Sequence, residues 1–150
     1  MNMSLDVKLN DMLKTAMKEK NKDDLNAIRN LKSAIKYEQI DKKLAEISDD
    51  LFLEVVSKQA KQRKDSINEF KKAGRNDLVD KETKELNFLL KFLPEQLTSQ
   101  QLELEIKKIM DIENIHEKKD FGKLMKIAVS SFKNVADGNS IKEVVNKLLN

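Results

Sequence analysis

The segment "EFKKAGRNDLVD" (residues 69–80) decides the fold, because it ends one helix and begins another within a few residues. Gly74 is the residue type that most readily adopts the left-handed backbone that closes a helix. Asn76, two residues later, is a favoured N-cap for the next helix. A connection this short makes the two helices run antiparallel. The sequence therefore predicts a long antiparallel helix hairpin that turns at Gly74.

Apolar residues recur every three or four positions on both sides of this turn. The helix before the turn is predicted to begin after Ser48 and to continue to Ala73. The helix after it runs to Leu93 and stops at Pro94, since the residue before a proline is disfavoured in helical geometry. This proline predicts a boundary between an N-terminal helical domain, residues 1–95, and a C-terminal domain, residues 96–150.

Further helices are predicted on either side of the hairpin. Two precede it, one over residues 5–17 and one that ends near Ile40, and three short ones follow it as a small three-helix bundle. Their expected starts are marked by Ser4, by Asp23 or Asp24, by the capping box of Thr98 and Gln101, by Asp120, and by a second capping box of Ser140 and Glu143.

The composition supports an all-α fold and excludes several classes of protein. Three glycines and one proline in 150 residues leave few turns for a strand-rich chain. The absence of cysteine rules out disulfides and cysteine metal sites and is compatible with a reducing cytoplasm, so a cytoplasmic location is expected. The first residues, "MNMSLDVKLND", lack a basic start and an apolar run, and no stretch is apolar enough to cross a bilayer.

The sequence shows no convergent set of catalytic residues. It contains no P-loop, dinucleotide fingerprint, nucleophile elbow or metal-ligand spacing. His116, the one histidine, lies in a charged connector and is interpreted as a solvated loop residue. We therefore expect no catalytic residue, no metal site and no cofactor.

Basic residues are concentrated before and within the hairpin turn, where only Asp65 and Glu69 oppose them. The seven basic residues of positions 58–75 are Lys58, Lys61, Arg63, Lys64, Lys71, Lys72 and Arg75. Arg29, Lys32 and Lys36 form a similar ladder on the preceding helix. If the two ladders are adjacent, they predict a phosphate-binding surface whose affinity falls with salt. The alternative is an ordinary solvated face with intrahelical pairs such as Lys61 with Asp65.

Arg63 differs from the other cations because it lies beside the apolar seam of its helix. A charge in that position is costly unless a carboxylate pairs with it. Glu38, Asp80 and Glu82 are the candidate partners on facing helices. The second interpretation is that Arg63 lines a groove and receives an external anion.

Three segments in one order resemble the YqeY family, also called GatB/YqeY domain proteins. They are "KQRKDSINEFKKAGRNDLVDKETKELNFLLKFLPEQL" (residues 61–97), "DFGKLMK" (residues 120–126) and "ADG" (residues 136–138). The resemblance covers essentially the whole chain. It implies a larger N-terminal helical domain followed by a small C-terminal helical bundle.

The same module resembles the tail of the GatB subunit of tRNA-dependent amidotransferase, a carbon-nitrogen ligase that takes its amide nitrogen from glutamine. The resemblance implies that such a tail helps to hold tRNA, whereas the chemistry lies in domains that this chain lacks. Gly122, Lys123 and Lys126 match the tail at the start of a helix, where free amides and cations can meet a phosphate. Gly122 has a second interpretation, close helix packing. Asn134 and Val135 depart from the glycine and basic residue that members commonly carry before the Ala-Asp-Gly turn.

The leading hypothesis is a non-catalytic cytoplasmic module that binds tRNA weakly and in a salt-dependent way. Its candidate contacts are Arg29, Lys32, Lys36, Lys61, Arg63, Lys64, Arg75, Gly122, Lys123 and Lys126. The alternatives are an adaptor that docks on an amidotransferase or another translation factor without touching RNA, and an amidotransferase in its own right.

Overall fold

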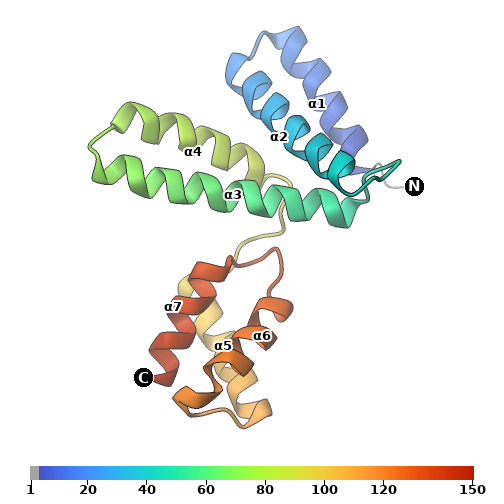
Figure 1. Cartoon of the computed structure of the whole chain (residues 1–150). Helices are drawn as coiled ribbons and strands as arrows, with labels where there is room; N and C mark the ends of the chain where they lie inside the picture. Colours follow the sequence, from blue (N-terminus) through green and yellow to red (C-terminus); the bar gives the residue numbers. More distant parts are fainter. Residues whose placement is uncertain (1–3) are drawn as a thin grey trace. The chain divides into compact units, whose positions relative to one another are not determined.

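The protein is all α-helical in the part that the structure describes, residues 4–150 of a computed structural model (Figure 1). This confirms the predicted fold class, and no strand occurs in those residues. The first three residues of the N-terminal stretch discussed above lie outside the described part. The helices are α1 (Leu5–Glu19), α2 (Lys22–Asp41), α3 (Asp49–Lys72), α4 (Asn76–Leu90), α5 (Ser99–Glu113), the 3-10 turn η1 (Lys118–Asp120), α6 (Phe121–Ser131) and α7 (Gly138–Leu149).

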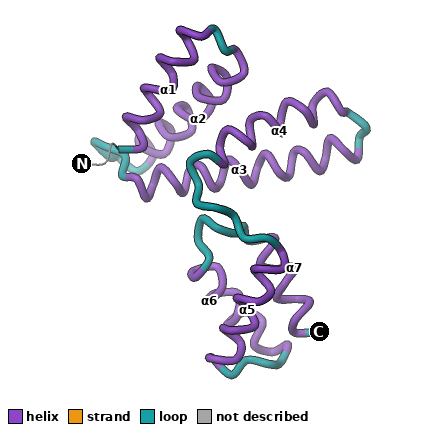
Figure 2. The backbone as a smooth tube through the Cα atoms, turned by 180° about the vertical axis from the view of Figure 1, so that it is seen from behind, coloured by secondary structure: helices purple, strands orange, loops and turns teal. Residues whose placement is uncertain are grey.

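The chain divides into two compact units, the first ending at Leu93 and the second comprising Pro94–Asn150. Each unit has a hydrophobic core of its own. In the first unit, α1 lies beside α2 and α3 lies beside α4, as Figures 1 and 2 both show. Leu9, Ile28 and Phe52 are almost fully buried where these helices meet. Phe92 joins that core through an edge-on contact with Phe52, with ring centroids 5.3 Å apart.

The turn between α3 and α4 is built on Gly74, as predicted. Its φ of 70° lies in the left-handed region, and the backbone N–H groups of Gly74 and Arg75 donate to the carbonyls of Lys71 and Phe70. These bonds satisfy two carbonyls that the end of α3 leaves open. The predicted cap of α4 is wrong by one residue. Arg75 is the N-cap, because its carbonyl already accepts from the backbone N–H of Val79 at 3.0 Å, and its side chain makes no capping hydrogen bond.

Local capping signals fix most of the other helix starts. Ser4 and Ser48 cap α1 and α3, and Thr98 with Gln101 forms the predicted capping box of α5. The second predicted box is wrong. Asp137 caps α7 by accepting from the backbone N–H of Ser140 at 2.8 Å, so the helix begins three residues before the expected start.

Among residues 4–150, four residues other than glycine adopt positive φ. Lys20 and Asn114 end α1 and α5 with φ of 56° and 54°. Lys43 and Asn134 lie in the connections after α2 and α6 with φ of 54° and 68°. The chain therefore makes several reversals with side chains in a conformation that glycine adopts at lower cost.

The second unit packs α5, α6 and α7 around one core. Ile106, Leu124, Ala128 and Val145 are almost fully buried there. The backbone N–H of Leu97 donates to the carbonyl of Val135 at 2.9 Å, which joins the segment after Pro94 to the connection between α6 and α7.

Candidate functional site

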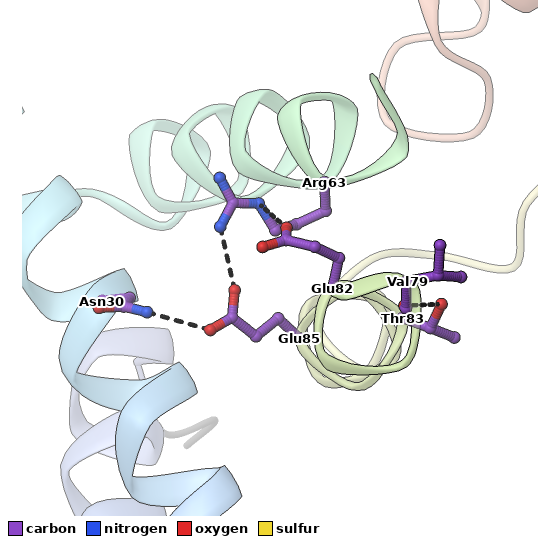
Figure 3. Close-up of polar contacts among 6 residues, drawn as sticks. All are labelled: Asn30, Arg63, Val79, Glu82, Thr83 and Glu85. Atoms are coloured by element: carbon purple, nitrogen blue, oxygen red, sulfur yellow. Dashed lines mark hydrogen bonds and ion pairs between the residues drawn. The ribbon is translucent and has the colours of Figure 1, made fainter. Parts of the chain in front are cut away.

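Arg63 of α3 lies at the centre of a polar network that joins three helices (Figure 3). Its Nη1 donates to Oε2 of Glu85 at 3.0 Å, and its Nε lies 3.1 Å from Oε2 of Glu82. The Nε and Oε2 atoms of the second contact are buried and have no hydrogen bond, so that contact is an ion pair with poor angles. The other oxygen of Glu85 accepts from the side-chain amide of Asn30 on α2 at 3.2 Å. Through Glu85, the network connects α2, α3 and α4.

This network explains why a helix with an apolar seam carries Arg63 beside that seam, and Gln59, one turn before it, lines the same region. Both residues line a small pocket between the three helices, together with Asn30, Glu85 and the apolar Leu31. Arg63 side-chain atoms are 25% exposed, against 14% for Glu82 and 12% for Glu85. One cation faces two carboxylates, so the cluster carries a net negative charge. This geometry fits the ion-pair interpretation of Arg63 better than the interpretation in which Arg63 receives an external anion.

The sequence predicts Glu82 as a candidate partner of Arg63, but neither Glu85 nor Asn30. The signal for Glu85 is its spacing, since it lies three residues after Glu82 and four before the buried Leu89 on the same side of α4. Asn30 has no comparable signal. It is exposed, and only the packing of α2 against α4 brings its amide to Glu85.

Exposed lysines on α3 remain available to a ligand. Lys58 and Lys61 are exposed and form no ion pair within residues 4–150. In particular, Lys61 does not form the pair with Asp65, one example of the intrahelical pairs expected on an ordinary solvated face. Lys64, by contrast, is half-buried and interacts within the protein. The unpaired cations of the described α3 thus include Lys58 and Lys61, which lie one turn apart.

Arg75 is exposed at the turn and is paired locally. Its Nε and Nη2 donate to the two carboxylate oxygens of Asp77 at 3.2 and 3.1 Å. This hydrogen bonding, together with the attraction of opposite charges, raises the pKa of Arg75 and holds the pKa of Asp77 below its usual range. The carboxylate partly neutralises the charge that Arg75 would offer to a phosphate.

Two basic residues of α2, Lys32 and Lys36, lie near α1. The ammonium group of Lys32 donates to the side-chain carbonyl of Asn10 on α1. Asn30, by contrast, reaches α4 from the other side of α2. Arg29 and Lys36 are exposed and form no ion pair within residues 4–150. Lys36 also lines a shallow hollow between α1 and α2, beside Asp6.

In the second unit, Gly122, Lys123 and Lys126 lie on α6 and are exposed. A Cβ added at Gly122 would meet no atom within 4 Å, so close packing does not explain the glycine. Asp120 precedes α6 without capping it through its side chain, and the 3-10 turn η1 leads into it. Lys133 and Asn134, which precede the Ala-Asp-Gly turn, both interact within the protein.

Residues 4–150 contain no cluster of three or more histidine, cysteine, aspartate or glutamate side chains placed to hold a metal ion. His116 is exposed in the connection after α5. Among the described helices, none has the length and apolar character required to span a membrane.

Comparison with known proteins identifies a family and several relatives. The family described as Yqey-like protein matches residues 6–149. A protein of Saccharomyces cerevisiae named "Altered inheritance of mitochondria protein 41, mitochondrial" is 39% identical over 101 residues, which cover 66% of this chain and 55% of that protein. Proteins of the same name from Kluyveromyces lactis and Lachancea thermotolerans are 42% identical over 77 residues and 36% identical over 88 residues. Those matches cover 51% and 57% of this chain, and 42% and 47% of the relatives.

The chain thus spans about half the length of the curated relatives it matches. All three relatives are named as mitochondrial proteins. The cytoplasmic location expected from the composition is therefore wrong. The composition is a poor guide here because a lack of cysteine indicates only that disulfides are absent.

Proposed function

The chain belongs to the family of Yqey-like proteins, and from this premise we propose that it is a non-catalytic module that binds tRNA through exposed lysines and arginines. The observation that carries the proposal is the pair Lys58 and Lys61 on α3. Both are exposed, lie one turn apart and have no carboxylate partner within residues 4–150. Two such cations repel each other and are stabilised by a polyanion, whose phosphates they neutralise with release of counterions.

Other exposed cations of each unit are further candidate contacts. Arg29 and Lys36 contribute from α2 and Lys123 and Lys126 from α6, and all four are exposed. Arg63 is left out of the proposed contacts because two carboxylates hold it. Lys64, Lys32 and Arg75 contribute less because each already interacts within the protein. Association with a tRNA-dependent amidotransferase is part of the proposal and rests on the resemblance to the tail of its GatB subunit.

The test is a titration of the purified chain with tRNA at low and at moderate salt. We expect weak binding at low salt that declines as salt rises. The double variant Lys58→Glu/Lys61→Glu should weaken binding and lower the slope of log affinity against log salt by about 1 for each phosphate that is no longer neutralised. The matched control is Lys14→Glu/Lys18→Glu on α1, which reverses two exposed lysines of similar spacing. Equal effects of the two double variants, or no binding at low salt, would contradict the proposal.

A second candidate function, a protein-binding adaptor, is favoured by one observation. Leu104 and Ile112 on α5 are 60% and 80% exposed and lie two turns apart on one side of that helix. Exposed apolar side chains at this spacing are typical of a helix that docks on a partner. Retention of an amidotransferase subunit by the tagged chain after ribonuclease treatment, and its loss in Leu104→Ser/Ile112→Ser, would establish the adaptor role.

A further inference from the structure

One face of α2 is exposed over most of the length of the helix and carries both cations and apolar groups. We define the α2 face as Arg29, Ser33, Lys36, Tyr37 and Ile40, all of which are exposed. Their spacing of four, three, one and three residues places them on one side of an α-helix. The buried residues of α2, among them Leu31 and Ile35, lie on the other side.

The apolar members of the α2 face, Tyr37 and Ile40, do not contribute to the core of the first unit. Tyr37 is 69% exposed and Ile40 is 67% exposed, whereas Leu31 and Ile35 of the same helix are buried. The hydroxyl of Tyr37 has no hydrogen-bond partner in the part of the chain that the structure describes. The two side chains are three residues apart, on the same side of α2 as Lys36.

The charge around this spot favours an anionic ligand. Residues 29–43 contain five basic and two acidic residues. Of the acidic pair, Glu38 is bound to Lys42 at 3.7 Å, and Asp41 lies one turn after Tyr37. Arg29 and Lys36 have no carboxylate partner within residues 4–150. The hollow next to Lys36 is lined by Lys32, Ser33 and Gln39, with Asp6 as its one carboxylate.

We propose that the α2 face binds an unpaired nucleotide of the RNA, with the base stacked on Tyr37 and the adjacent phosphates neutralised by Lys36 and Arg29. Aromatic rings stack on every type of base, and a neighbouring cation neutralises the backbone. Ile40 extends the apolar surface on which the base lies. The inference rests on the proposed function and adds a ligand class to it, a single-stranded segment such as a loop or an end.

The sequence provides a direct optical measurement of this contact. Tyr37 is the one tyrosine of the chain, which has no tryptophan, so the emission of the protein above the phenylalanine region comes from Tyr37 alone. The probes are a short single-stranded oligouridylate and an abasic chain of equal length, each titrated into the full chain at low salt. We expect oligouridylate to quench the emission and to bind more tightly than the abasic chain.

Variants separate stacking from charge. Tyr37→Leu keeps an apolar side chain, removes the ring and should bind oligouridylate about fivefold to tenfold more weakly, with no change for the abasic chain. Its binding is followed by anisotropy of a label on the oligonucleotide. Tyr37→Phe should retain most of the affinity. Met17→Ala on α1, which removes another exposed apolar side chain, should change neither affinity.

Each remaining outcome overturns the inference. Salt-dependent RNA binding that Tyr37→Leu leaves unchanged would remove the stacking contact and leave the proposed function intact. Equal losses of affinity for oligouridylate and for the abasic chain would show that Tyr37 acts on the phosphate backbone of the ligand or on the fold of the protein. Loss of a protein partner in Tyr37→Leu with unchanged RNA binding would assign the α2 face to a protein. No binding by the unmodified chain would overturn the stacking and the proposed function together.

Discussion

Arg63 of α3 and Glu85 of α4 are joined by a hydrogen-bonded ion pair of 3.0 Å, and the second oxygen of Glu85 is held by Asn30 of α2. Three helices thus meet at one carboxylate. Because the position of a helix along its axis determines which side chains meet, this contact favours one register of α2, α3 and α4 over a register displaced by one turn.

Loss of Arg63 should destabilise the first unit. Arg63→Met keeps the apolar stem but leaves Glu82 and Glu85 close together with little solvent, and we expect the free energy of unfolding to fall by about 2 kcal/mol. The measurement is urea unfolding followed by circular dichroism. The control Lys58→Met on the same helix should change stability by less than about 0.5 kcal/mol. Adding Glu82→Gln and Glu85→Gln to Arg63→Met should recover part of the loss, and equal stability of the two single variants would contradict this account.

Replacing glycine with alanine should lower stability at Gly74 and raise it at Gly122. Gly74 has a φ of 70°, so Gly74→Ala forces a side chain into the left-handed region and should cost about 1 kcal/mol. Gly122 lies inside α6 with open space where a Cβ would be, so Gly122→Ala should stabilise the second unit by about 0.5 kcal/mol. Thermal unfolding of the two variants compares them, and a gain at Gly74 would disprove the conformational argument.

The start of α7 can be tested with a matched pair of caps. Asp137→Ala removes the side chain that accepts from Ser140 N–H and should lower stability by about 1 kcal/mol. Ser140→Ala keeps that N–H and should be nearly neutral. Chemical denaturation of both variants provides the comparison. A larger loss in Ser140→Ala would favour the cap predicted from the sequence.

The contact of Glu103 on α5 with Lys147 on α7 should make the second unit less stable in acid. Hydrogen bonding from Lys147 at 3.0 Å, aided by Lys107, holds the pKa of the Glu103 carboxyl below its usual value. A lowered pKa means that the contribution is fully present above the ordinary glutamate pKa and is lost as pH falls through the lower, folded value. Carbon-detected NMR titration should show the Glu103 pKa rising in Lys147→Gln. An unchanged pKa would mean that the contact does not persist in solution.

Much of the fold could be predicted from local signals. Gly74, Ser48 and the Thr98–Gln101 box each act through backbone groups within four residues, so the sequence itself contains the whole interaction. The error at α7 arises from competition between two good caps, Asp137 and Ser140, that local rules rank almost equally.

The candidate site is less predictable because it depends on contacts between helices. The sequence indicates that Arg63 needs a carboxylate, but the choice of Glu82 together with Glu85 follows from how α3 and α4 pack. Similarly, spacing alone groups Lys32 with Arg29 and Lys36, and its bond to Asn10 depends on α1. The position of a cation on a helix can be predicted from the sequence, whereas its availability to a ligand depends on which side chains of other helices contact it.

The left-handed residues Lys20 and Lys43 mark two positions at which a substitution could raise the stability of the protein. A lysine in that conformation costs about 1 kcal/mol more than a glycine, whereas asparagine, as at Asn114 and Asn134, tolerates it better. Part of the gain from a glycine is offset by a more disordered unfolded chain. Lys20→Gly and Lys43→Gly, which lie at chain reversals outside the Arg63 network, are thus expected to give a more stable protein for laboratory work.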